Sequence, residues 1–181
     1  MSFSVILPTL NEKGHIIELI EQISNIFILK KKKFEIIVVD DNSVDGTQDV
    51  VEQHLSDKKF LKLIKRKSNI KNLADASQEG VNESKNDYII WMDADFQHPP
   101  KYIKNFIERS ESYDVVISSR FLKKSERYFN TDKLKKEINE NQSYFFNKLC
   151  KLLLFKDLTD YTSGFICVRK AILQGYTLKG Y

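Results

Sequence analysis

The chain has 181 residues, of which 41% are hydrophobic and 12% aromatic, and its 29 basic and 25 acidic residues give a formal net charge of +4. This composition fits one compact globular domain and excludes a largely disordered chain, because it includes only six glycines and three prolines. The small positive charge does not require nucleic acid as a partner, and it is compatible with a phosphate-bearing substrate or an anionic membrane surface.

Cysteine use and hydropathy point to a cytoplasmic protein. Cys150 and Cys167 stand in no metal-ligand spacing, and two cysteines are too few for a secreted disulfide scaffold. The N-terminus lacks a basic region followed by a long apolar core, and no later stretch approaches the roughly 18 apolar residues that span a bilayer. We therefore expect neither a signal peptide nor a transmembrane helix.

Short apolar runs alternate along the chain with segments whose apolar residues recur at helical spacing. The runs predict strands over residues 3–7, 34–39, 60–64, 88–92 and 114–117. The helical segments between them cover residues 16–26, 50–55 and 73–81, and a fourth follows Pro99 and Pro100. This alternation is typical of βαβ units. It predicts an α/β fold in which helices flank a mostly parallel sheet, within one domain.

Polar residues follow four of the predicted strands, at 8–12, 40–43, 93–95 and 118–120. In an open parallel sheet these strand ends meet at one edge, where ligands bind. The chain lacks both G-x-G-x-x-G and G-x-x-x-x-G-K-[ST], so a Rossmann dehydrogenase or a P-loop ATPase would lack its phosphate cradle. A metal held by Asp95, with Gln97, would bind phosphates instead, since Mg²⁺ takes one or two carboxylates plus substrate oxygens.

Five motifs in fixed order carry a resemblance to a known family. They are PTLNE from residue 8, VVDDNSVDGT from residue 38, DADFQHPP from residue 93, SRF from residue 119 and DYTSGF from residue 160. In this order they resemble the family 2 glycosyltransferases, which have the Rossmann-like GT-A fold. Within that family they are most similar to the polyprenyl-phosphate sugar transferases of the dolichyl-phosphate mannose synthase group. The resemblance spans nearly the whole chain, so we expect a GT-A catalytic domain over residues 1–181.

The resemblance also implies roles for individual residues. The nucleotide-sugar pocket would be lined by Pro8, Leu10, Glu12, Val39, Asp41, Asp93 and Ala94. The metal, Mg²⁺ or Mn²⁺, would be ligated by Asp95 and Gln97. The basic groups facing the phosphates would be Arg120 and Arg169. The catalytic residues would be Asp93, Asp95 and Arg120.

The implied reaction moves a hexose from a GDP- or UDP-linked sugar to a polyprenyl phosphate, dolichyl or undecaprenyl, with inversion. A phosphate monoester has a second pKa of about 6, so this acceptor arrives deprotonated and needs no strong general base. Two alternatives stay open. One is a family 2 transferase acting on a glycan or protein hydroxyl, which requires a carboxylate base. The other is a nucleotide-sugar-binding module without catalysis.

The segment over residues 120–156 is expected to face the acceptor or the membrane. Its six basic residues are Lys123, Lys124, Arg127, Lys133, Lys135 and Lys136, and they precede an aromatic and leucine-rich stretch over residues 144–155. Such a combination binds anionic membrane surfaces, which predicts peripheral association at the cytoplasmic face of a membrane. A helix facing the core or a second subunit is the simpler alternative.

The acids at the strand ends also have simpler explanations. Asp93 and Asp95 would suit solvated loop acids or a cap for the helix after Pro99, and Glu12 would suit the dipole of the helix that follows it. The convergence of four polar clusters favours a metal-dependent site. His98 is expected to be a packed turn residue beside the metal loop.

Overall fold

A computed structural model of the chain describes residues 1–67, 72–119, 160 and 163–173, and every structural statement below refers to these residues. Contacts divide the chain into two compact units, Met1–Val116 with Phe165–Tyr181, and Ile117–Gly164. The elements that position the site belong to the first unit. Arg120 and the predicted membrane-facing segment lie outside the described residues.

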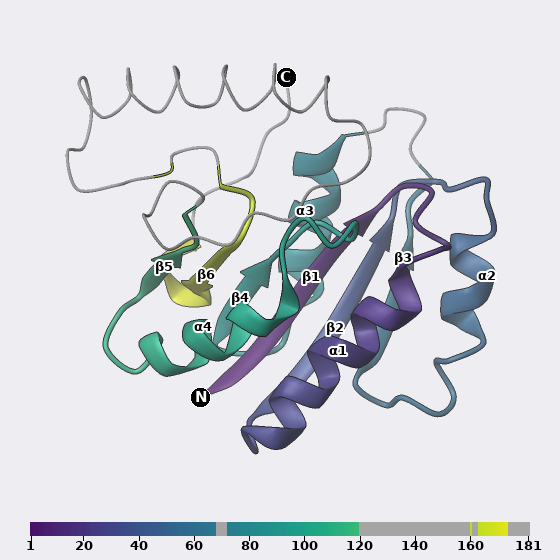
Figure 1. Cartoon of the computed structure of the whole chain (residues 1–181). Coiled ribbons are helices and arrows are strands. Elements are labelled where there is room, and N and C mark those ends of the chain that lie inside the picture. The colour runs from purple at the N-terminus through teal and green to yellow at the C-terminus, as the bar shows by residue number, and fades with distance from the viewer. Residues whose placement is uncertain (68–71, 120–159, 161–162, 174–181) are drawn as a thin grey trace, which may run out of the picture. The chain divides into compact units, whose positions relative to one another are not determined.

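A six-stranded sheet organises the first unit, in the order β3-β2-β1-β4-β6-β5 (Figure 1). Its strands are β1 Ser2–Thr9, β2 Lys33–Asp40, β3 Leu61–Lys65, β4 Tyr88–Trp91, β5 Val115–Ile117 and β6 Ile166–Arg169. The pairs β1–β2, β1–β4 and β2–β3 are parallel, whereas β6 runs antiparallel to β4. The five predicted strands are confirmed. The sixth strand, β6, was not predicted.

The helices follow the strands as the spacing predicted. They are α1 Ile16–Leu29, α2 Thr47–Glu52, α3 Leu73–Glu83 and α4 Ile103–Arg109, with 3-10 turns η1 Pro100–Tyr102 and η2 Lys170–Leu173. Pro100 opens η1, where its missing N–H leaves no hydrogen bond unmade. Within the described residues, no helix is long and apolar enough to cross a membrane.

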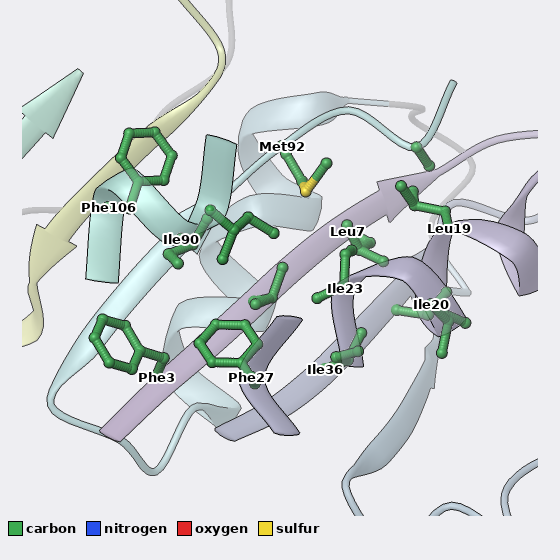
Figure 2. Close-up of a cluster of buried hydrophobic side chains, with 14 of the residues drawn as sticks. Phe3, Leu7, Leu19, Ile20, Ile23, Phe27, Ile36, Ile90, Met92 and Phe106 are labelled. Carbon is green, nitrogen blue, oxygen red and sulfur yellow. The ribbon is translucent and has the colours of Figure 1, made fainter. Parts of the chain in front are cut away.

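Alternate residues of β1 face two separate apolar layers. Phe3 and Leu7 pack with the inner face of α1, including Ile23 and Phe27, all without solvent exposure (Figure 2). Side chains alternate between the two faces of a strand, so Ile6 points to the opposite face and joins the cluster under α3. The sheet is therefore buried on both sides, which is the usual condition of parallel strands.

Helix α3 approaches the sheet closely because Gly80 has no side chain. A Cβ added at Gly80 would lie 2.5 Å from Ile6 Cγ2 and 3.2 Å from Val39 Cγ2, both on fully buried strand residues. The sheet side chains cannot withdraw, since α1 covers the other face. Helix α3 is thus held against β1 and β2 at a spacing that only glycine allows.

We predict that Gly80→Ala destabilises the protein by about 1–3 kcal/mol, the usual cost of overpacking a core. Helix propensity alone would favour alanine by up to about 1 kcal/mol, so the sign of the change separates the two effects. Urea denaturation measures it. Gly14→Ala is the matched control, because a Cβ there meets nothing within 4 Å. Equal stabilities of Gly80→Ala and the wild type would contradict the close packing.

Candidate active site

The loops after β1 and β2 form one hydrogen-bonded frame at the carboxyl edge of the sheet. The Asn11 N–H donates to Ser43 Oγ at 2.8 Å, and the Glu12 N–H donates to Thr47 Oγ1 at 2.9 Å. Asn11 and Asn42 have φ values of 60° and 61°, a left-handed conformation that asparagine tolerates better than most residues. These bonds fix Glu12 relative to the start of α2.

Asp40, the last residue of β2, organises this frame from within. It is completely buried, and its carboxylate accepts hydrogen bonds from Ser43 N–H at 2.9 Å, Ser43 Oγ at 2.6 Å and Gln48 Nε2 at 2.5 Å. Thr9 Oγ1 donates to its second oxygen at 3.3 Å. Asp40 therefore acts as a structural acid that joins the ends of β1 and β2.

The loop after β4 presents Asp93 and Asp95 on either side of Ala94, which is 3% exposed. The Asp93 N–H donates to His98 Nδ1 at 3.0 Å, so the imidazole closes the turn. The His98 ring stacks on Phe165 with a centroid distance of 5.2 Å. The loop is thereby packed against Phe165, and Asp93 Oδ2 lies 3.5 Å from the same His98 nitrogen.

Asp95 and Gln97 lie side by side in this loop. The Gln97 N–H donates to Asp95 Oδ1 at 2.9 Å, and Gln97 Nε2 donates to Asp95 Oδ2 at 2.6 Å. Phe96 between them has φ 61°, and its ring meets His15 edge-on at 6.1 Å, at the start of α1. The aromatic contact holds the loop beside the Glu12 frame, so residues distant in sequence meet there.

The site carries an excess of negative charge. The pKa of Glu12 is raised above its ordinary value, first by burial and then by the charge of Asp95, with smaller contributions from Asp45 and Asp93. Each of these carboxylates therefore lies close enough to Glu12 to act on it. Their mutual repulsion is the condition that a bound cation would relieve.

Glu35, a buried acid at the opposite end of the sheet, differs from Glu12 because a cation pairs with it. Burial acts to raise the pKa of Glu35, but hydrogen bonds from Lys62 and Ser4 outweigh it and lower this pKa. Lys62 Nζ lies 2.5 Å from Glu35 Oε2, and Ser4 Oγ donates to Oε1 at 2.6 Å. Glu35 is thus neutralised within the chain, as buried carboxylates usually are.

The donor set at Asp95 and Gln97 fits a hard divalent cation. A carboxylate and an amide supply oxygen ligands, which Mg²⁺ and Mn²⁺ prefer. No group of three His, Cys, Asp or Glu side chains suited to a metal occurs among the residues that the structure describes. An ion at Asp95 would complete its coordination with waters and substrate phosphates, as Mg²⁺ commonly does.

The remaining nucleoside-side residues cluster at the ends of β1 and β2. Pro8 and Val39 are direct partners in the register of these strands. Leu10 is 39% exposed at the rim, whereas Asp41 is 6% exposed. The Val39 side chain is fully buried under α3, so this residue offers a ligand only its backbone.

Arg169 is not brought together with these residues. Because β6 runs antiparallel to β4, Arg169 lies opposite Tyr88, at the far end of β4 from Asp93. There it pairs with Asp114, and its guanidinium lies 5.0 Å from the centroid of the Tyr88 ring. Its predicted place at the phosphates depended on the direction of a strand that the sequence analysis did not identify.

Sequence analysis also did not single out Arg66, which directly follows β3. Its side chain is 3% exposed and contacts the carboxylates of Asp41, Asp75 and Glu79. The signal was present, since Asp75 and Glu79 stand four residues apart and so share one face of α3. A lone arginine at a strand end, followed by such a pair, indicates a buried ion cluster.

A comparison with known protein families shows to which family the chain belongs. The sequence profile of glycosyl transferase family 2 matches residues 4–177. The chain belongs to this family. The expected relationship and the α/β fold of GT-A type are thereby confirmed.

The curated relatives include dolichol-phosphate mannosyltransferases. That of Pyrococcus furiosus is 36% identical over 179 residues, which are 98% of this chain and 49% of that protein. That of Saccharomyces cerevisiae is 32% identical over 122 residues, 67% of this chain and 45% of that protein. The chain therefore spans about half the length of these relatives.

A solved glycosyl-transferring enzyme has the same fold. Glucosyl-3-phosphoglycerate synthase from Mycobacterium tuberculosis, in complex with Mn²⁺, UDP and phosphoglyceric acid, aligns with a TM-score of 0.64 and 18% identity. The alignment covers 95% of this chain and 57% of that protein. At this identity the similarity supports the fold alone.

We predict that Glu12→Gln stabilises the protein at pH 7 and has little effect at pH 4. The raised folded-state pKa means that ionised Glu12 opposes folding, fully so above that pKa. The opposition disappears as the pH falls below the ordinary value of 4.5, where both states are protonated. Urea denaturation of the variant and the wild type at both pH values measures the difference.

Glu18→Gln is the control for this measurement, because Glu18 is an exposed acid in the first turn of α1. Its charge favours the helix dipole, so its removal brings no gain at pH 7. A Glu12→Gln protein that is less stable than the wild type at pH 7 would contradict the repulsive cluster.

Proposed function

We propose that the chain is the catalytic part of a metal-dependent, inverting hexosyltransferase whose donor is a GDP- or UDP-linked sugar and whose acceptor is a polyprenyl phosphate. The observation that carries the proposal is the acidic cluster of Glu12, Asp93 and Asp95, on the loops that follow β1 and β4, the two parallel neighbours between which the strand order reverses. Ligands bind at such a switch point in open α/β sheets. Identity of 36% with a dolichol-phosphate mannosyltransferase supports the choice of acceptor.

Asp95 and Gln97 would hold the cation, Mg²⁺ or Mn²⁺. When bound, the ion would neutralise the charge that develops on the leaving nucleoside diphosphate. Gln97 donates to both carboxylate oxygens of Asp95, so the two side chains lie side by side in the loop. Each Asp95 oxygen keeps a second acceptor site, and Gln97 would offer its amide oxygen to the cation.

The nucleoside would lie over the frame built by the loops after β1 and β2. Pro8, Leu10 and Glu12 would line it from β1, with Val39 and Asp41 from β2. Asp93 and Ala94 would contact the sugar nucleotide from the β4 loop. The sheet register supports this arrangement, because Pro8 pairs with Val39 and Thr9 pairs with Asp40.

The acceptor would need no general base from the chain. A phosphate monoester is mostly deprotonated near neutral pH and attacks the anomeric carbon directly. In-line attack from the face opposite the leaving diphosphate inverts the configuration. Arg120 is proposed to stabilise the phosphates, and residues 120–156 to face the acceptor at the cytoplasmic side of a membrane.

Product formation tests the reaction. The chain, and the full natural protein where it is longer, is incubated with GDP-mannose, UDP-glucose or UDP-N-acetylglucosamine, Mn²⁺ and a polyprenyl phosphate. A glycolipid is expected from one donor, detected by mass spectrometry. Donor binding without transfer by the full protein would favour a binding module, and transfer to a glycan or protein hydroxyl alone would favour the other family 2 activity.

We predict that Asp95→Asn weakens Mn²⁺-dependent donor binding by more than about tenfold, because an amide lacks the charge that holds the cation. The thermal midpoint of the metal-free protein should not fall, since the substitution relieves repulsion with Glu12. Calorimetric titration of each donor with and without Mn²⁺ measures the effect. Asp57→Asn, at an exposed position before β3, is the matched control. Unchanged Mn²⁺-dependent affinity in Asp95→Asn would show that Asp95 is not a metal ligand.

A further inference from the structure

Arg66 is a buried guanidinium at the carboxyl end of β3, the strand at one edge of the sheet. Its Nη1 lies 2.6 Å from Asp41 Oδ1, and its Nε donates to Glu79 Oε1 at 2.9 Å. Its Nη2 lies 3.8 Å from Asp75 Oδ2. One cation therefore joins the end of β2 to the first turns of α3.

Backbone hydrogen bonds around Arg66 also join β3, the end of β2 and the start of α3. The Arg66 N–H donates to Asp40 O at 2.9 Å, which extends the pairing of β3 with β2. The Asn72 N–H donates to Asp41 Oδ2 at 2.8 Å, and Asn72 Oδ1 in turn accepts from the Ala74 N–H to cap α3. The start of α3 is thus tied to Asp41 through its backbone.

These contacts fix the orientation of the Asp41 carboxylate. One oxygen is held by Arg66 and the other by the Asn72 N–H. Each carboxylate oxygen has two acceptor sites, so each retains capacity for a further donor. A ligand reaching Asp41 would meet an acceptor in one defined direction, suited to a ribose hydroxyl or a base N–H.

The charges favour this arrangement over a simple surface ion pair. Burial acts to lower the pKa of Arg66, but the carboxylates of Glu79 and Asp41 outweigh it and raise this pKa. Asp75 and Glu79 are 46% and 44% exposed, whereas the Asp41 side chain is 9% exposed. The exposed acids hold Arg66 from the solvent side, and Arg66 in turn presents its inner face to Asp41.

We propose that Arg66 is a positioning residue for donor recognition, which holds Asp41 ready to accept a hydrogen bond from the nucleoside. The inference rests on the proposed function, since it requires a nucleotide at this edge of the sheet. It assigns Arg66 to the nucleoside and not to the diphosphate. Removal of Arg66 should therefore weaken the binding of a nucleotide more than that of pyrophosphate.

Calorimetric titrations with UDP, GDP and pyrophosphate, each with Mn²⁺, test this on the wild type, Arg66→Met and Arg66→Lys. We expect Arg66→Met to lose about tenfold or more in affinity for the nucleotide that the wild type binds. Its affinity for pyrophosphate should stay within about twofold of the wild type. Arg66→Lys should recover part of the loss, because lysine keeps the charge but lacks the planar fork.

Lys65→Met is the control, because Lys65 is the cation next to Arg66 in the chain but lies outside its ion cluster. The Lys65 side chain is 41% exposed, and its Nζ lies 2.5 Å from Glu52 Oε1 on α2. It should bind all three probes as the wild type does. A folded Arg66→Met protein with unchanged nucleotide affinity, or with equal losses for nucleotide and pyrophosphate, overturns the inference. If Arg66→Met does not fold, the same criteria apply to Arg66→Lys. A wild type that binds neither nucleotide overturns the proposed function and, with it, this inference.

Discussion

The parallel pairing of β1 between β2 and β4 is the constraint on which the rest of the structure depends. Ile6 pairs with Ile37 on one side and with Trp91 on the other, and all three strands run in the same direction. Both faces of β1 are buried, so a slip of one residue would exchange the two apolar layers. This register brings the loops after β1, β2 and β4 to one edge. The sheet therefore holds the acids of these loops close together in spite of their mutual repulsion.

Three buried or half-buried acids in or beside this sheet differ in the groups that surround their charge. Glu35 receives a lysine and several hydrogen bonds from the chain, and Asp41 receives Arg66. Glu12 lies instead among the acids of the β4 loop, and its pKa is raised first by burial and then by the charge of Asp95. The chain therefore pairs Glu35 and Asp41 with its own cations, and it concentrates negative charge at Glu12 and the β4 loop, where the proposed cation would bind. Such clustering is common at functional sites, which carry strain or charge that the fold elsewhere avoids.

Sequence patterns were sufficient for the elements whose signals are local. The apolar runs located five strands, and the D-A-D-F-Q-H-P-P motif located the loop that packs against α1. The patterns did not reveal β6, because a four-residue strand takes its direction from a distant partner. For the same reason, the patterns did not indicate that Arg169 lies at the end of β4 away from Asp93. Arg66 was missed because the Asp75–Glu79 spacing marks an acidic face of α3 but not the cation that it meets. Arg66 reaches this face only because α3 packs on β1 and β2 beside the end of β3.

The most direct test of the account is the location of a bound cation. In a ¹⁵N-labelled sample, substoichiometric Mn²⁺ with UDP or GDP should broaden the amide signals of Asp93 to His98 and of Glu12 first. The amides of Glu35 and Lys62, at the opposite end of the sheet, should keep their line widths at the same Mn²⁺ concentration. Selective broadening at the β4 loop is the result that the account predicts. Broadening centred elsewhere, or none at the β4 loop, would contradict a metal-dependent site at Asp95.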